Sequence, residues 1–179
     1  MEGVQPPVAA ASAPREALSL SVGDMVVYGV HGVGAVAARE MRSVHGAEQK
    51  VIVVALAGGL SVQLPLTRAR EHLRPIVDEA GIASIEGVLR ASPRVSKDSW
   101  LKRRRDSEAK LRDPLGLAEV IRDGCARGAG SHLSPGEREL VNRARRLLTN
   151  EIAFARGVSV EDAEAWLDAQ LAPEPARAT

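Results

Sequence analysis

The spacing of apolar residues changes once along this chain, near residue 77, and this change constrains the fold more than any other feature. Before it, short runs rich in Val and Ile alternate with glycines, the pattern of strands joined by tight turns. After it, apolar residues recur at intervals of three and four, as on the buried face of a helix. We therefore expect an α+β chain in which a small β unit precedes a helical bundle.

Five short strands are expected in the first part, over residues 24–28, 33–41, 49–57, 60–64 and 73–76. The dipeptide Gly58-Gly59 between the third and fourth runs is a hairpin signal, and residues 60–64 alternate like a half-buried strand. Five short strands with glycine turns in so short a segment predict a small Tudor-like or SH3-like β-barrel.

About five helices are expected in the second part, forming a compact bundle over residues 82–89, 96–111, 113 onward, 134–157 and 159–171. The third opens at Asp113-Pro114, and we expect Gly124 and Gly128 to loosen or end it. Ser134-Pro135-Gly136-Glu137 has the form of a capping box with Pro just inside the helix, and Gly157 closes that helix.

Four segments follow from this pattern. Residues 1–18 are rich in Ala and Pro without periodicity and predict a disordered arm. Residues 19–76 form the β unit, residues 77–171 the helical unit, and residues 172–179 a disordered tail or linker. The chain has a single cysteine and no apolar run of membrane-spanning length, which favours a reducing, cytoplasmic location without a membrane partner.

The chain lacks recognisable catalytic or metal-binding motifs. Its four histidines and its cysteine do not stand at metal-ligand spacing, and no nucleophile, Walker or zincin motif occurs. We therefore expect a protein that is not an enzyme, with no cofactor, no metal and no small-molecule substrate.

A basic cluster is the sharpest candidate site. Residues 94–112 hold eight basic and three acidic side chains, although the whole chain has a net charge of only +1. The functional hypothesis is DNA binding, with cations on phosphates and an indole wedged at a distorted base step. The structural alternative is that the tryptophan anchors its helix and the cations form a solvated face. The candidate DNA-binding residues are Trp100, Lys97, Lys102, Arg103, Arg104 and Arg105.

Two further clusters call for an interpretation. Arg39, Glu40 and Arg42 fall near an expected hairpin tip beside exposed strand edges, where they could meet a partner, or simply form a solvated turn. Arg143-Ala144-Arg145-Arg146 is interpreted as a solvated helix face with ion pairs, and Trp166 as a core residue.

The chain resembles the CarD/CdnL family of bacterial RNA polymerase-binding transcription regulators. The resemblance covers about Leu20 to Leu171. The stretches that carry it are residues 22–28 (VGDMVVY), 31–34 (HGVG), 100–104 (WLKRR), 133–138 (LSPGER) and 144–148 (ARRLL).

The resemblance implies a Tudor-like domain that contacts the β subunit of RNA polymerase and a helical domain whose tryptophan, here Trp100, stabilises the open promoter complex. It implies a nucleoid-associated protein in the cytoplasm. It also implies a polymerase-contacting arginine at Arg42. The expected polymerase-binding residues are Arg42, Arg39, Gln63 and Tyr28.

The sequence departs from the family at Gly29, where many members have proline, and at Gln63, which is basic in some members. In the family's namesake, such a module precedes an acidic AT-hook tail and pairs with a zinc-binding protein, CarG. The alternative function is therefore a protein–protein adaptor that links RNA polymerase to a CarG-like regulator without binding DNA itself.

Overall fold

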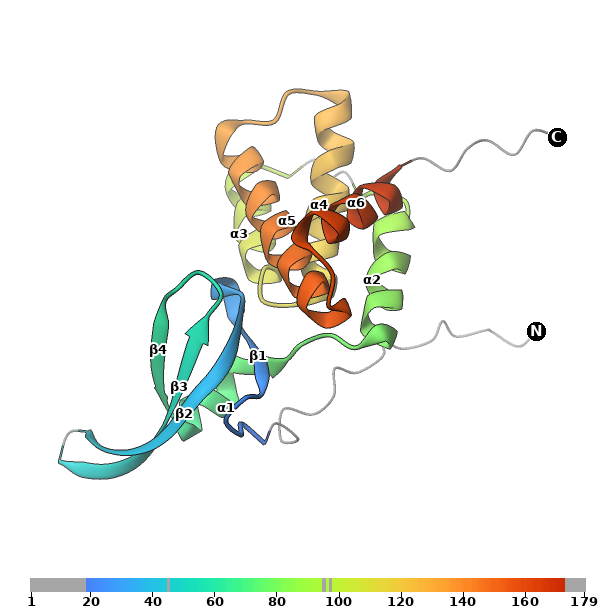
Figure 1. Cartoon of the computed structure of the whole chain (residues 1–179). Coiled ribbons are helices and arrows are strands. Elements are labelled where there is room, and N and C mark those ends of the chain that lie inside the picture. The colour runs from blue at the N-terminus through green and yellow to red at the C-terminus, as the bar shows by residue number, and fades with distance from the viewer. Residues whose placement is uncertain (1–18, 45, 95, 97, 173–179) are drawn as a thin grey trace, which may run out of the picture.

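The computed structural model describes residues 19–44, 46–94, 96 and 98–172. The arm expected over residues 1–18 and residues 173–179 of the expected tail lie outside the described residues. The described chain forms a sheet unit followed by a helical unit, which confirms the predicted α+β class (Figure 1).

The sheet unit is one antiparallel sheet with the order β4-β3-β2-β1-β5. All five predicted strands are present, as β1 (Met25–Tyr28), β2 (Val33–Val44), β3 (Ala47–Leu56), β4 (Ser61–Pro65) and β5 (Leu73–Pro75). One face covers a small core. Its buried members are Leu20, Val26, Val36, Ile52, Val54, Leu56, Leu64, Ala69 and Leu73.

Strands β2 and β3 continue beyond the rest of the sheet as a two-stranded ribbon that points away from the helices (Figure 1). β1 pairs with β2 only through Ala35, and β4 pairs with β3 only back to Val51, so the outer part of the ribbon has no third described strand. One extra residue, Ala37, forms a bulge in β2 before the two-stranded part begins beyond Glu40, because the pair Val36/Val54 is followed by Ala38/Val53.

Two short elements were not predicted. A 3-10 turn spans Gly29–His31, and helix α1 (Leu66–His72) lies between β4 and β5. Seven residues are too few to show a helical repeat, and α1 buries only Ala69. The helix is held by Ala69 and Leu66, which pack on the core of the sheet unit, and local sequence does not reveal this contact.

Five helices form the helical unit, as predicted: α2 (Glu79–Arg90), α3 (Trp100–Lys110), α4 (Pro114–Gly130), α5 (Pro135–Arg156) and α6 (Val160–Leu171). The capping box of α5 is present, with Ser134 accepting from the backbone of Glu137 and the Glu137 side chain accepting from Ser134. Gly157 ends α5 in the left-handed conformation, at φ 63°.

The expectation that Gly124 and Gly128 loosen or end the third helix is wrong. Helix α4 continues through both glycines to Gly130. At Gly124 the missing side chain permits close packing of two helices, because a Cβ atom there would lie 2.3 Å from the Val141 side chain of α5. The absence of a side chain lets the two helices approach each other. Around this contact lies the main core, which includes Leu117, Ile121, Leu148, Ile152 and Leu167.

A buried ion pair joins the two units. Arg74 of β5 donates two hydrogen bonds to the Glu151 carboxylate of α5, at 2.5 and 2.7 Å, and the backbone N–H of Val77 donates a third at 3.1 Å. The Glu151 side chain is only 1% exposed. Beside it, Val30 packs against the helical core, and a Cβ atom on Gly32 would contact Leu147 of α5 at 3.5 Å.

We predict that Glu151→Ala lowers the free energy of unfolding by about 3–5 kcal/mol, because it leaves the Arg74 guanidinium and the Val77 N–H without their partner. Glu79→Gln is the matched control, since Glu79 also pairs with an arginine of α5 but is 73% exposed, and should cost less than about 1 kcal/mol. Urea denaturation of both variants measures the difference. Equal, small losses would contradict a structural role for the buried pair.

Candidate nucleic-acid and partner-binding surfaces

Helix α3, which carries the basic cluster, lies on the surface of the helical unit. It packs against α4 and α5 but buries none of its own residues. The helix is therefore held by its first turn and by ion pairs rather than by a core-facing stripe, and most of its length is open to a partner.

The half-buried indole of Trp100 lines a small crevice between α3, α4 and the start of α5. The other walls of the crevice include Leu133, Leu140 and Val141, and its volume is about 70 Å³. A Cβ atom on Gly136 would lie 2.9 Å from Cζ2 of the indole. Glycine at the second position of α5 therefore makes room for the ring, and Trp100 contributes both to packing and to the surface.

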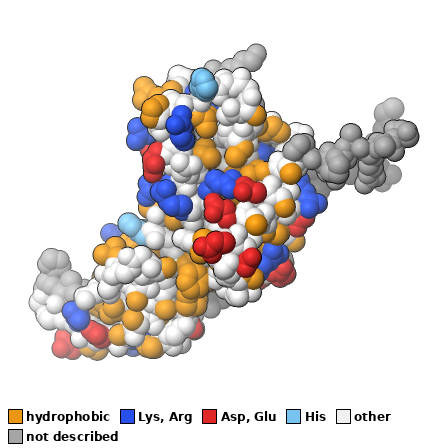
Figure 2. Space-filling model, turned by 45° about the horizontal axis from the view of Figure 1, so that its top comes forward, with side chains coloured by type: hydrophobic (Ala, Val, Ile, Leu, Met, Phe, Trp, Pro, Cys, Tyr) orange, Lys and Arg blue, Asp and Glu red, His pale blue; other side chains and the backbone are white. Residues whose placement is uncertain are grey.

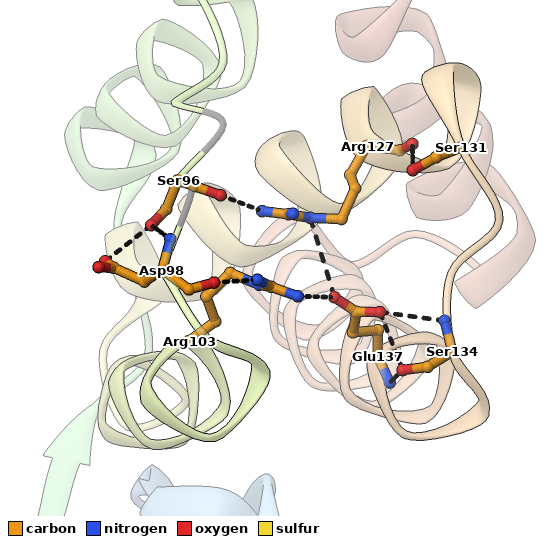
Figure 3. A network of polar contacts seen from close by, with 7 residues as sticks. All are labelled: Ser96, Asp98, Arg103, Arg127, Ser131, Ser134 and Glu137. Atoms are coloured by element: carbon orange, nitrogen blue, oxygen red, sulfur yellow. Dashed lines mark hydrogen bonds and ion pairs between the residues drawn. The ribbon is translucent and has the colours of Figure 1, made fainter.

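Glu137 ties the first turn of α3 to α5 (Figure 3). Its carboxylate accepts from Arg103 at 2.9 Å and from the Ser134 backbone and hydroxyl at 3.0 and 2.8 Å, and Arg127 lies 3.9 Å away. Arg103 also donates to the Asp98 carbonyl. Desolvation alone would raise the pKa of Glu137, but the hydrogen bonds from Ser134 and Arg103 outweigh it and lower the pKa to about 2.

The other cations of α3 differ in how far they are already paired. Lys102 contacts Asp98 at 3.2 Å and Arg104 contacts Glu108 at 2.9 Å, both on exposed surface. Arg105 is exposed and forms no ion pair with any residue that the structure describes. Lys97 lies outside the described residues. Arg105 is thus the α3 cation most available for an anionic partner.

The second basic cluster forms ion pairs, as its interpretation as a helix face implied. Arg145 contacts Asp168 of α6 at 2.5 Å, and Arg146 contacts Glu139 at 3.3 Å. On the face shown in Figure 2, basic and acidic side chains are intermixed across the helical unit.

Trp166 packs against the core, with the Arg156 guanidinium 4.9 Å from its ring centroid, so its expected core position is confirmed.

The expected polymerase-binding residues do not form one cluster. By register, Arg42 and Gln63 share a face of the sheet, because Gln63 pairs with Val53 and Val53 with Ala38, four residues before Arg42. They are separated by about 13 Å along the strands and by two strand spacings, about 10 Å, across the sheet. Arg42 lies on the outer ribbon and is paired with Glu40 at 2.7 Å.

Arg39 and Tyr28 lie elsewhere. Arg39 pairs with Ile52 and so lies on the opposite face from Arg42, beyond the edge of the small core. Tyr28 ends β1, at the end of the sheet near the helical unit, and its ring stacks on His31 with centroids 4.9 Å apart. A single flat partner surface therefore cannot touch all four residues.

Within the described ranges, no three His, Cys, Asp or Glu side chains gather as a metal site. The Trp100 crevice is also far smaller than pockets that hold cofactors, which measure hundreds of cubic ångströms. None of the described helices combines the length and hydrophobicity that a membrane span requires.

Sequence reasoning missed the second role of Glu137. The capping-box pattern identified it as the partner of Ser134, yet its carboxylate also holds Arg103, 34 residues away. An arginine in a helix of otherwise exposed cations gave no local signal that it turns inward. The crevice under Trp100 was likewise hidden, because Gly136 could be interpreted only as part of the cap.

We predict that Glu137→Gln lowers stability at pH 7 by about 1–2 kcal/mol, because it weakens both the cap and the contact with Arg103. A carboxylate whose pKa is lowered by folding stabilises the fold fully at pH values above its ordinary pKa of 4.5. This contribution is lost as the pH falls toward 2. The deficit of Glu137→Gln relative to wild type should therefore shrink over that window in urea denaturation. Glu139→Gln, on the exposed side of α5, is the control, and a pH-independent deficit would contradict the prediction.

Comparison with known proteins identifies both units. Residues 20–77 match the CarD-like/TRCF RID domain, and residues 84–168 match the CarD C-terminal domain. The Bacillus subtilis (strain 168) protein called "Putative transcription factor YdeB" is 22% identical over 142 residues, which cover 77% of this chain and 93% of that protein.

The match to the RID domain confirms the predicted Tudor-like fold of the sheet unit, and the C-terminal match covers the helices from within α2 to within α6. Both matches are to domains of transcription regulators, in agreement with the name of the relative. The chain therefore belongs to the CarD/CdnL family and has a role in transcription.

Proposed function

We propose that this protein regulates transcription by docking on the β subunit of RNA polymerase through residues 19–76 and by acting on promoter DNA through residues 77–171. In this proposal it stabilises the open complex at the nucleoid, without a cofactor or chemistry of its own. The observation that carries the proposal is the presence of an RID-type domain fixed against a helical domain whose basic helix α3 is open to solvent.

The outer ribbon of β2 and β3 supports the docking half of the proposal. Its backbone edges lack a third described strand, and such edges recruit strands from partners. Arg42 lies on this ribbon, exposed and held only by an exposed pair with Glu40, which an acidic partner surface could replace at little cost. Gln63 lies on the same face and adds a neutral donor and acceptor.

Helix α3 supports the DNA half. Arg105, Lys102 and Arg104 lie on its exposed surface and can neutralise phosphates, with Arg105 free of any described acid. Trp100 presents the open part of its indole at the start of the same helix. Because the Arg74–Glu151 pair fixes the two units, polymerase docking would set where α3 meets the DNA.

One observation favours the alternative of an adaptor that binds polymerase and a CarG-like zinc protein but not DNA. Lys102, Arg103 and Arg104 each already contact an acidic side chain of the chain itself, which lowers the charge available for phosphates. An adaptor would use α3 or its neighbours to bind a protein. The salt dependence of DNA binding separates the two functions, because only phosphate contacts release counterions.

For the docking half, we predict that Arg42→Glu weakens binding of the full-length protein to core RNA polymerase at least about thirtyfold, because it places an acid where an interface charge pair is proposed. Arg68→Glu is the matched control, since Arg68 is also exposed and paired with an acid, Glu71, but lies on α1. Biolayer interferometry measures both affinities. Binding unaffected by Arg42→Glu, or absent in wild type, contradicts the docking proposal.

For the DNA half, we predict that full-length wild type binds a promoter duplex with a salt dependence that Arg105→Ala reduces. Loss of one phosphate contact should lower the slope of log Kobs against log salt by about 0.9. Arg70→Ala removes a cation that is likewise exposed, from α1, and should leave the slope unchanged. Fluorescence anisotropy between 50 and 200 mM salt provides the measurement, and wild-type binding without a salt slope would support the adaptor instead.

A further inference from the structure

Three exposed apolar side chains gather where α5 turns into α6, a segment we call the α5–α6 corner (residues 154–162). Phe154, Val158 and Val160 are 49%, 42% and 44% exposed, and neither hydrophobic core includes them. Phe154 is the only phenylalanine of the chain, and the three other aromatic residues are more buried. Clustered apolar side chains that a fold leaves in solvent are typical of a binding surface.

The turn after α5 brings these side chains onto one corner. The backbone N–H of Val158 donates to the carbonyl of Ala153 at 3.1 Å, and Gly157 is left-handed there. This bond folds Val158 back onto the last turn of α5, which carries Phe154. Val160 follows two residues later as the first residue of α6. The apolar side chains therefore belong to one compact surface.

The charges around the corner are mainly acidic. The first turn of α6 holds Glu161 and Asp162, and α6 contains no basic residue. Arg156, in the last turn of α5, is already held by Glu79 of α2 at 2.8 Å and lies against the Trp166 ring. Glu79 is itself 73% exposed, so three carboxylates face a single guanidinium. The corner thus combines apolar surface with an excess of negative charge.

This combination favours a protein partner over a nucleic acid. The carboxylates would repel phosphates, whereas a segment that carries Lys or Arg beside a large apolar side chain would match both the charge and the exposed aromatic ring.

The corner is also remote from the basic helix α3. Gly136, which packs on Trp100 of α3, and Phe154 lie near opposite ends of α5, and the helical rise between them is about 27 Å. In Figure 1, α3 and α6 lie on opposite sides of the helical unit. A partner on the corner would therefore leave α3 free.

We infer that the α5–α6 corner is a docking surface for a basic amphipathic segment of a protein partner. A large apolar side chain of that segment packs on Phe154, and its flanking cations pair with Glu161 and Asp162. The inference goes beyond the proposed function, because this contact needs neither promoter DNA nor the β2–β3 ribbon.

The test uses the full-length protein and three synthetic peptides: an amphipathic helix of Leu and Lys, the same peptide with Glu for each Lys, and the same peptide with Ser for each Leu. Methyl NMR locates the binding, and the Leu-Lys peptide alone should shift the signals of Val158 and Val160. Phe154→Ser should lower affinity for this peptide about fivefold, because an aromatic contact is lost. Glu161→Lys should lower it about threefold, through charge repulsion.

Leu60→Ser and Glu139→Lys are the matched controls, since Leu60 and Glu139 are likewise exposed but lie away from the corner, and neither should change the affinity. Thermal unfolding checks each variant. If Phe154→Ser does not fold, Glu161→Lys decides, because its side chain is exposed.

Four outcomes overturn the inference: no binding of the Leu-Lys peptide to wild type, shifts on α3 or the ribbon instead of the corner, equal binding of the Ser peptide, or equal losses in the corner and control variants. The proposed function stands in each case, because none of these measurements involves DNA or polymerase.

Discussion

The contact between Arg74 and Glu151 determines how the two halves of this protein act together. Each half has its own core, and Val30 of the sheet unit also packs against the helical core. The bidentate pair, with the Val77 N–H as a third donor, is satisfied in only one arrangement, and its burial makes any other arrangement costly. Val30 and Leu147 fill the space beside it with apolar contacts. A surface on the β2–β3 ribbon and a surface on α3 are therefore held in a fixed relation.

Local chemistry made most of the fold predictable. Strands, the Gly58-Gly59 turn, the α5 capping box and the Gly157 end each depend on residues within a few positions of one another, and the structure confirms them. The misinterpretation of Gly124 shows the limit of this reasoning. A glycine that breaks a helix and a glycine that lets two helices touch look the same in sequence, and only the position of Val141 distinguishes them.

The candidate site was less predictable than the fold, for a related reason. The sequence identified the basic turn after Trp100, but it could not reveal that Arg103 turns inward to Glu137 while Arg105 stays unpaired among the described residues. The spacing of three residues places Arg39 and Arg42 on opposite faces, but the sequence could not reveal which face each takes, because the Ala37 bulge reverses the alternation beyond Val36. Charge composition gives the number of cations, whereas three-dimensional pairing determines which of them a partner can use.

The Ala37 bulge also limits how the ribbon can change in length during evolution. Side chains alternate between faces, so adding one residue between Ala37 and Arg42 would move Arg42 to the opposite side, whereas adding two to each strand would preserve its side and move the tip outward by about 7 Å. Insertions in this ribbon should therefore be tolerated in even steps, and the reach of the protein toward a partner can vary among relatives only in increments of one full pleat.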